Sequence, residues 1–85
     1  MITESQLQNR IAIGKRIAEI RQSKKLTQVQ LAELSGLNRV NINKIENGRY
    51  NVSIDILQKV CDALDVKLDI VEKEFSNESN INLKI

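Results

Sequence analysis

The most distinctive side chains of this sequence lie between residues 39 and 47. On a helical wheel of about 100° per residue, Ile42 and Ile45 share one face with Glu46. The opposite face carries amides, cations and one small apolar group, from Val40, Asn43, Lys44 and Asn47, with Arg39 at its edge. Arg and Lys can donate to guanine, Asn can pair with adenine in bidentate fashion, and an apolar methyl can meet the thymine methyl. This face is therefore suited to reading base edges in a DNA major groove.

The same segment is a poor helix former. Four Asn residues fall within the stretch LSGLNRVNINKIENG, and Asn side chains compete with the helix for backbone hydrogen bonds. Gly36 and Gly48 bracket the segment and are natural residues for ending a helix. We interpret the helix as one chosen for the side chains that it presents, with its ends held in place because its own propensity is low.

A repeated six-residue pattern predicts the elements that position this segment. An apolar residue precedes a capping residue, and a second apolar residue follows four positions after the cap, which is typical of a helix start with a hydrophobic staple. The pattern begins at Ile2-Thr3, Leu26-Thr27, Leu37-Asn38 and Val52-Ser53. Gln6 and Gln30 complete capping boxes in the first two copies.

Helical periodicity follows each of these starts and predicts helices over residues 4–23, 28–35, 39–47 and 54–64. The inward stripes are expected to hold Leu7, Ile11, Gly14 and Ile17 in the first helix, and Ile54, Leu57, Val60, Cys61 and Leu64 in the last. Residues 1–65 are thus expected to form one helical domain.

After Asp65 the periodicity changes to alternation. Val66, Leu68 and Ile70 alternate with charged residues, which predicts a short strand over residues 66–74, followed by a flexible tail over residues 75–85. A lone strand leaves its backbone groups unpaired, so we expect it to pair with its counterpart in a second chain. The alternative is pairing with a local N-terminal segment. The expected fold class is an all-α domain of four to five helices with one C-terminal strand.

Composition is consistent with a small aliphatic domain. The chain has 85 residues, 2% aromatic residues, no Pro and one cysteine, Cys61. It has no apolar run long enough to span a membrane, and its first ten residues do not resemble a secretory signal, so the cytoplasm is the expected compartment. Residues 14–49 hold eight basic and three acidic side chains, a net charge of +5, which favours an anionic partner.

Nothing in the sequence indicates catalysis. The chain has no His, which excludes His-based triads and His metal sites, and it has no Gly-rich phosphate loop. Cys61 falls on the inward stripe of the last helix, where core packing is the better explanation. We therefore expect no enzyme activity, no metal and no cofactor.

The stretch LTQVQLAELSGLNRVNINKIENGRYNVSIDILQKVCDAL resembles the phage-repressor (XRE/Cro-like) type of helix-turn-helix domain, and the likeness extends over residues 14–66. The resemblance implies that the helix over residues 39–47 enters the major groove while the preceding helix lies across the DNA backbone. It implies base reading by Arg39, Val40 and Lys44, and we add Asn43 from its place on the same face.

The resemblance also implies roles outside the reading face. Gln28 and Asn47 would contact the DNA backbone, and Arg21 and Glu46 would form a partly buried ion pair. Four further residues can contribute to backbone binding: Asn38 at the helix start, and the cations Lys24, Lys25 and Arg49.

Taken together, these features predict a bacterial or phage-encoded, dimeric, sequence-specific regulator that binds double-stranded DNA and acts as a repressor. Two alternatives stay open. In the first alternative, the chain is an antitoxin that represses its own operon and inhibits a protein toxin. Some antitoxins of this family have a dimerising strand after the helical domain. Alternatively, the helix-turn-helix fold serves only for protein interaction.

Overall fold

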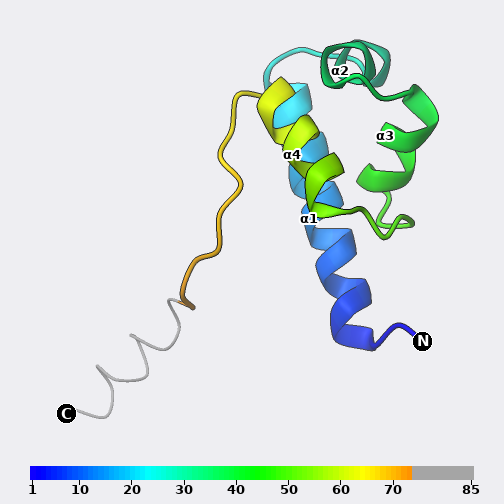
Figure 1. Ribbon diagram of the computed structural model, residues 1–85, viewed down its shortest axis with the longest axis vertical. Coiled ribbons are helices and arrows are strands. Elements are labelled where there is room, and N and C mark those ends of the chain that lie inside the picture. Colours follow the sequence, from blue (N-terminus) through cyan, green and yellow to red (C-terminus); the bar gives the residue numbers. More distant parts are fainter. Residues whose placement is uncertain (74–85) are drawn as a thin grey trace, which may run out of the picture.

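The computed structural model describes residues 1–73, and within them the chain folds into four helices. They are α1 (Glu4–Ser23), α2 (Gln28–Ser35), α3 (Arg39–Glu46) and α4 (Ile54–Ala63). α3 packs against α1 and α2, and α2 packs against α4, so the two short helices form a unit supported by the two longer ones (Figure 1). The prediction of an all-helical domain is confirmed.

All four helices begin at the residues that the capping pattern indicates. Each cap side chain accepts a hydrogen bond from the backbone N–H three residues later, at distances between 2.8 and 3.1 Å. Thr3 and Thr27 form complete capping boxes, since Gln6 and Gln30 each accept from the backbone N–H of the cap. These contacts are local, which explains why the starts could be predicted.

The four helix ends also share one arrangement. A residue with a positive φ follows each helix, directly after α2 and two residues after the last residue of α1, α3 and α4, and it lets backbone N–H groups fold back onto the last helical carbonyls. Gly36 (φ 73°) and Gly48 (φ 70°) occupy two of these positions as expected. The other two fall to Lys25 (φ 59°) and Asp65 (φ 57°), which the sequence did not mark because residues other than glycine adopt this conformation only rarely.

The core is entirely aliphatic. Leu31, Ile42, Val60 and Leu64 are almost completely inaccessible to solvent, and the same cluster contains Ile17, Ala32 and Ile45. Cys61 is buried beside them, and this burial, together with the neighbouring Asp62 carboxylate, raises the pKa of its thiol. Its position supports a packing role.

Two of the predicted inward stripes are wrong at their ends. Leu7 and Ile11 are 37% and 41% exposed, because the first turns of α1 extend beyond the other helices (Figure 1). Ile54 is 75% exposed at the start of α4. Periodicity predicted the direction of these side chains, but the helices do not cover them, and Ile11 is approached by the backbone of the turn at Gly48.

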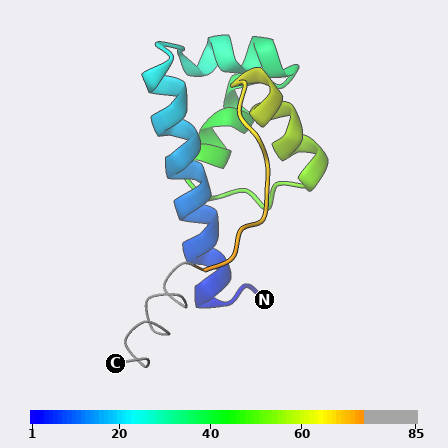
Figure 2. The same ribbon diagram turned by 90° about the vertical axis from the view of Figure 1, so that its left-hand side faces the viewer.

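The predicted strand over residues 66–74 is not formed in the described part of the chain. Residues 66–73 leave α4 as a single segment with no regular secondary structure (Figure 2). A strand requires a neighbour, and a single copy provides none along this segment. Val66 N–H closes α4 on Cys61 O at 2.9 Å, and Ile70 N–H donates to the adjacent Asp69 carboxylate at 2.7 Å. Residue 74 and the predicted tail over residues 75–85 lie outside the described residues.

None of the helices described within residues 1–73 has the length and hydropathy needed to cross a bilayer.

Candidate nucleic-acid interface

The turn between α2 and α3 sets the orientation of the predicted reading helix. Gly36 adopts the left-handed conformation, and Leu37 N–H donates to Ala32 O at 2.9 Å, which ends α2 abruptly. Asn38 then caps α3 by accepting from Asn41 N–H at 2.8 Å. Three residues thus connect two helices whose directions change sharply, and the arrangement is that of a helix-turn-helix.

The buried side of α3 is fixed to the core. Ile42 and Ile45 are 1% and 4% exposed and pack in the aliphatic cluster. On the opposite side, Val40 is 52% exposed, and three polar members of the predicted reading set are also exposed, namely Arg39, Asn43 and Lys44. The structure therefore brings all four base-reading candidates onto one accessible surface.

A close approach of backbones holds the end of α3 on α1. Gly14 is buried in the middle of α1 and faces the last turn of α3. A Cβ atom at this position would overlap the carbonyl oxygen of Ile45 and lie 2.7 Å from that of Glu46. Only glycine permits this contact, so the helix pair is positioned by a missing side chain.

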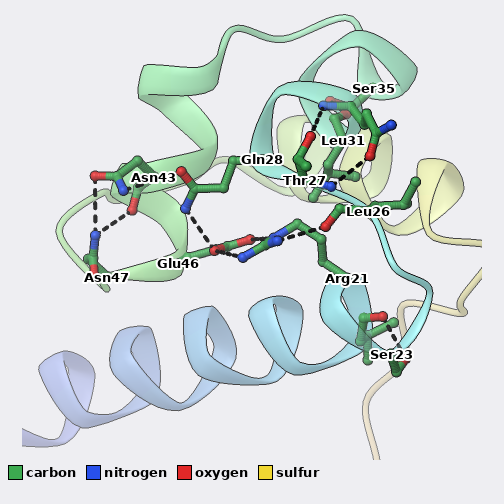
Figure 3. Close-up of polar contacts among 12 residues, drawn as sticks. Arg21, Ser23, Leu26, Thr27, Gln28, Leu31, Ser35, Asn43, Glu46 and Asn47 are labelled. Atoms are coloured by element: carbon green, nitrogen blue, oxygen red, sulfur yellow. Dashed lines mark hydrogen bonds and ion pairs between the residues drawn. The ribbon is translucent and has the colours of Figure 1, made fainter.

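A two-pronged ion pair joins the same two helices. Arg21 Nε lies 2.6 Å from Glu46 Oε2, and the Arg21 terminal nitrogen Nη2 donates to Glu46 Oε1 at 3.1 Å (Figure 3). The other terminal nitrogen donates to Leu26 O at 2.8 Å. The side chains are only 11% and 6% exposed. The predicted pairing of Arg21 with Glu46 is therefore present, and it also ties down the turn after α1.

Gln28 joins this ion pair from the start of α2. Its Nε2 donates to Glu46 Oε1 at 3.0 Å, and its Oε1 lies 3.5 Å from Asn43 Nδ2 (Figure 3). An amide nitrogen carries two hydrogens, so the second remains able to donate to a phosphate. The predicted phosphate contact is thus compatible with the position of Gln28, which has a structural role in addition.

The two asparagines predicted to contact the DNA backbone differ in what they can offer. Asn47 Nδ2 donates to Asn43 O at 2.9 Å and to Asn43 Oδ1 at 3.2 Å, so both of its hydrogens are directed back into α3. Asn38 uses only its oxygen for capping and keeps its amide hydrogens for a phosphate. In this conformation Asn38 fits the predicted role, and Asn47 would have to turn its side chain first.

The predicted backbone cations do not form one cluster. Lys24 and Lys25 belong to the connection between α1 and α2, at the top of Figure 1, whereas Arg49 belongs to the loop that follows α3 lower in the same view. All three are exposed. The two lysines are therefore separated from Arg49 along the molecule, and the two groups would meet different parts of a DNA backbone.

The sequence predicted the pairing of Arg21 with Glu46. It did not predict that Gln28 would extend this pair into a network reaching Asn43. Gln28 and Glu46 are 18 residues apart and belong to different helices. No spacing rule connects them, because their contact depends on how α2 and α3 cross. A polar residue at the start of α2 was the only available signal.

Comparison with known proteins agrees with this geometry. The family model described as Helix-turn-helix matches residues 17–71. The immunity repressor protein of Bacillus phage phi105 is 42% identical over 64 residues, which are 75% of this chain and 44% of that protein. Antitoxin PezA of Streptococcus pneumoniae serotype 4 is 33% identical over 63 residues, or 73% of this chain and 40% of that protein. The chain thus spans less than half the length of these two relatives.

Among solved structures, the restriction-modification controller protein C.AhdI from Aeromonas hydrophila superposes with a TM-score of 0.70 at 38% identity, covering 72% of this chain and 88% of that one. The residues matched by the family model contain α2, α3, α4 and the last seven residues of α1. On the family match and on the geometry of α2 and α3, this chain belongs to the helix-turn-helix family.

Proposed function

We propose that this protein is a sequence-specific transcriptional regulator that binds double-stranded DNA and acts as a dimeric repressor. One observation carries the proposal. The exposed side of α3 presents Arg39, Val40, Asn43 and Lys44 together, while the opposite side is locked into the core by Ile42 and Ile45. The similarity to the phage phi105 immunity repressor protein supports this choice of function.

In the proposed complex, α3 lies in the major groove. Arg39 and Lys44 donate to guanine or to nearby phosphates, and Val40 contacts a thymine methyl. Asn43 is held by long contacts of 3.2 and 3.5 Å to Asn47 and Gln28, which a bidentate contact with adenine can replace. The Gln28 amide and the first N–H groups of α2 meet a phosphate, because a helix start favours negative charge.

The proposed partner is a second copy of this chain. A module of this size touches few base pairs, and helix-turn-helix dimers bind two half-sites spaced by about 34–36 Å, one turn of DNA. Residues 66–73 supply the contact: within the described residues, no backbone–backbone hydrogen bond joins residues 67–73 to the rest of the chain, and Ile70 is 95% exposed. Pairing two such segments would satisfy these backbone groups and bury Ile70 with the other apolar side chains of its face.

Selection of bound duplexes from a random pool by the full chain, read by sequencing, tests the proposal. We expect a motif made of two inverted half-sites. Affinity for that motif should fall steeply with salt, because phosphate contacts release counterions. Binding that shows no sequence preference at moderate ionic strength would refute sequence-specific regulation and favour a fold used only for protein interaction.

The similarity to antitoxin PezA supports a second candidate, an antitoxin that represses its own operon and binds a protein toxin. This candidate requires the gene beside that of this chain to encode a protein that is toxic alone and harmless when both are expressed. Co-expression of the two genes, followed by purification of the chain, would recover a complex. A neighbouring product that is neither toxic nor bound excludes the antitoxin role.

A further inference from the structure

We infer that two copies of this chain pair through residues 66–70 in one particular antiparallel register, with Leu68 on the two-fold axis opposite Leu68 of the second copy. The inference rests on the proposed dimer and specifies which residues meet in it.

The backbone of this segment is available for pairing with a partner strand. Within the described residues, no backbone–backbone hydrogen bond joins residues 67–73 to the rest of the chain. The Ile70 N–H is held only by the neighbouring Asp69 side chain. A strand with free N–H and C=O groups can pair with another such strand, and an antiparallel pair of identical segments satisfies the symmetry of a dimer.

The two faces of the segment differ in chemistry. Val66 and Leu68 are half-buried, while the side chains of Lys67 and Asp69 are 83% and 55% exposed and border the rim of a cleft that Leu68 also lines. Lys67 Nζ lies 3.6 Å from Asp69 Oδ2 within the same chain, so the two charges share one face. A correct register must match apolar residues on the inner face and opposite charges on the outer face.

Among registers centred on residues 67–69, only the one centred on Leu68 meets both conditions. It places Val66 opposite Ile70 and Leu68 opposite itself on the inner face, and it places Lys67 opposite Asp69 twice on the outer face. Moving the axis to Lys67 or to Asp69 puts two like charges opposite each other, which is destabilising. A one-residue slip of the pairing sets apolar residues against charged ones.

The helices leave room for the inner face of such a ribbon. A cleft of about 430 Å³ lies between the segment and the helices, lined by Ile13 of α1, Leu57 and Cys61 of α4, and Leu68. A second cleft of about 380 Å³ adjoins it and is bounded by Ile54 and Ile70. Each exceeds the about 150 Å³ that accommodates one benzene molecule. Apolar side chains of the partner strand can fill these clefts and cover Ile54, which is otherwise exposed.

Disulfide trapping reads the register directly. In the full chain with Cys61→Ala, we introduce Leu68→Cys, Lys67→Cys or Asp69→Cys singly and oxidise each variant with a glutathione buffer in the absence of DNA. Residues directly opposite lie about 4.5–5.5 Å apart between Cα atoms, within disulfide range, whereas diagonal neighbours at about 7–8 Å are too distant. We expect Leu68→Cys to form covalent dimers and the two matched controls to stay largely uncrosslinked. Preferential crosslinking of Lys67→Cys or Asp69→Cys overturns the register.

A charge exchange provides a second measurement that leaves the apolar face intact. Lys67→Glu and Asp69→Lys should each weaken the dimer about tenfold in Kd by sedimentation, because each change places two like-charge pairs across the axis. The double variant Lys67→Glu/Asp69→Lys should recover the affinity of the parent chain. A dimer that is insensitive to all three changes refutes the register alone. A parent chain that stays monomeric refutes the dimer as well, and neither readout depends on DNA binding.

Discussion

At the scale of single residues, Glu46 is the point where folding and recognition meet. Its carboxylate accepts from Arg21 on α1 and from Gln28 on α2, and it lies on the helix whose other side presents the reading face. A buried carboxylate is tolerated only when its hydrogen-bonding positions are filled. The ion pair therefore fixes the orientation of α3 through contacts on the side of the helix that faces α1 and α2.

Replacing one partner of this pair should destabilise the fold strongly. Arg21→Met leaves the Glu46 carboxylate buried without its counter-charge, and we expect the free energy of unfolding to fall by about 3–5 kcal/mol. Urea denaturation measures the change. The double variant Arg21→Met/Glu46→Leu removes both charges and should recover much of the loss. A single-variant loss below about 1 kcal/mol would show that solvent already screens the pair.

Val40 should control base preference without affecting stability. Its side chain is 52% exposed, so Val40→Ala should change the free energy of unfolding by no more than about 0.5 kcal/mol. In the proposed complex this variant loses discrimination at one thymine position, where a mismatch typically costs about 1–3 kcal/mol. Binding to a panel of single-base variants of the selected site measures the effect. An unchanged preference at every position contradicts the assigned role.

Gln28→Ala should weaken binding without changing base preference, in contrast to Val40→Ala. It removes the amide proposed to meet a phosphate, so affinity should fall to a similar extent for all duplexes. The matched control is Gln22→Ala, which removes an exposed glutamine from α1. The same binding panel separates the two outcomes, and a loss confined to particular bases would argue against a phosphate contact. Because Gln28 also donates to Glu46, a modest loss of stability should accompany the change.

At the scale of helices, the contact of α1 with α3 depends on the absence of a side chain. Gly14 lies in a helix interior, where glycine is normally unfavourable compared with alanine. The carbonyl groups of Ile45 and Glu46 occupy the space that a Cβ atom would need. The helix pair thus gives up local helix propensity for a close approach of two backbones.

The sign of Gly14→Ala distinguishes these two effects. Helix propensity alone predicts a gain of about 1 kcal/mol, whereas the steric overlap predicts a loss of about 1–3 kcal/mol or more as the helices are forced apart. We expect the loss. Thermal denaturation gives the answer, with an exposed position in the interior of α1, Asn9→Ala, as the control for propensity. A stabilised Gly14→Ala variant would show that α3 can shift at little cost.

At the scale of the whole molecule, three of the most exposed apolar side chains lie in or beside the segment that would meet the partner. Ile54, Ile70 and Val71 are between 75% and 95% exposed, and the first two border the same cleft. α3 lies on the opposite side of the molecule from residues 66–73 (Figure 1). Dimerisation and DNA binding can therefore occur on separate surfaces.

Because the two surfaces are separate, we expect that one exposed residue of the proposed dimer surface, Ile70, controls assembly. Ile70→Glu should leave the free energy of unfolding of the monomer within about 0.5 kcal/mol, because its side chain is 95% exposed in the single chain. It should also convert dimers to monomers, since a charge would enter the inner face of the ribbon. Sedimentation at micromolar concentration checks this. Leu34→Glu, at a 61% exposed site on α2, is the control and should remain dimeric.

The sequence by itself determined where each helix begins, because a cap and its staple act within one turn of helix. Thr3, Thr27, Asn38 and Ser53 each bind a backbone N–H three residues later, so no tertiary contact is needed to recognise them. The exposed side chains of α3 could be predicted from helical periodicity, because periodicity is also a local property of the sequence. The roles of these side chains toward DNA stay predictions.

Only the tertiary structure decided how the elements meet. The contact of Gln28 with Glu46 depends on the crossing of α2 and α3, and the exposure of Leu7 and Ile11 depends on how far α1 extends past its neighbours. The segment from residue 66 to 73 is the clearest case. Its alternation predicts a strand, yet the strand is absent from the single chain, because hydrogen bonds between strands need a second strand to receive them.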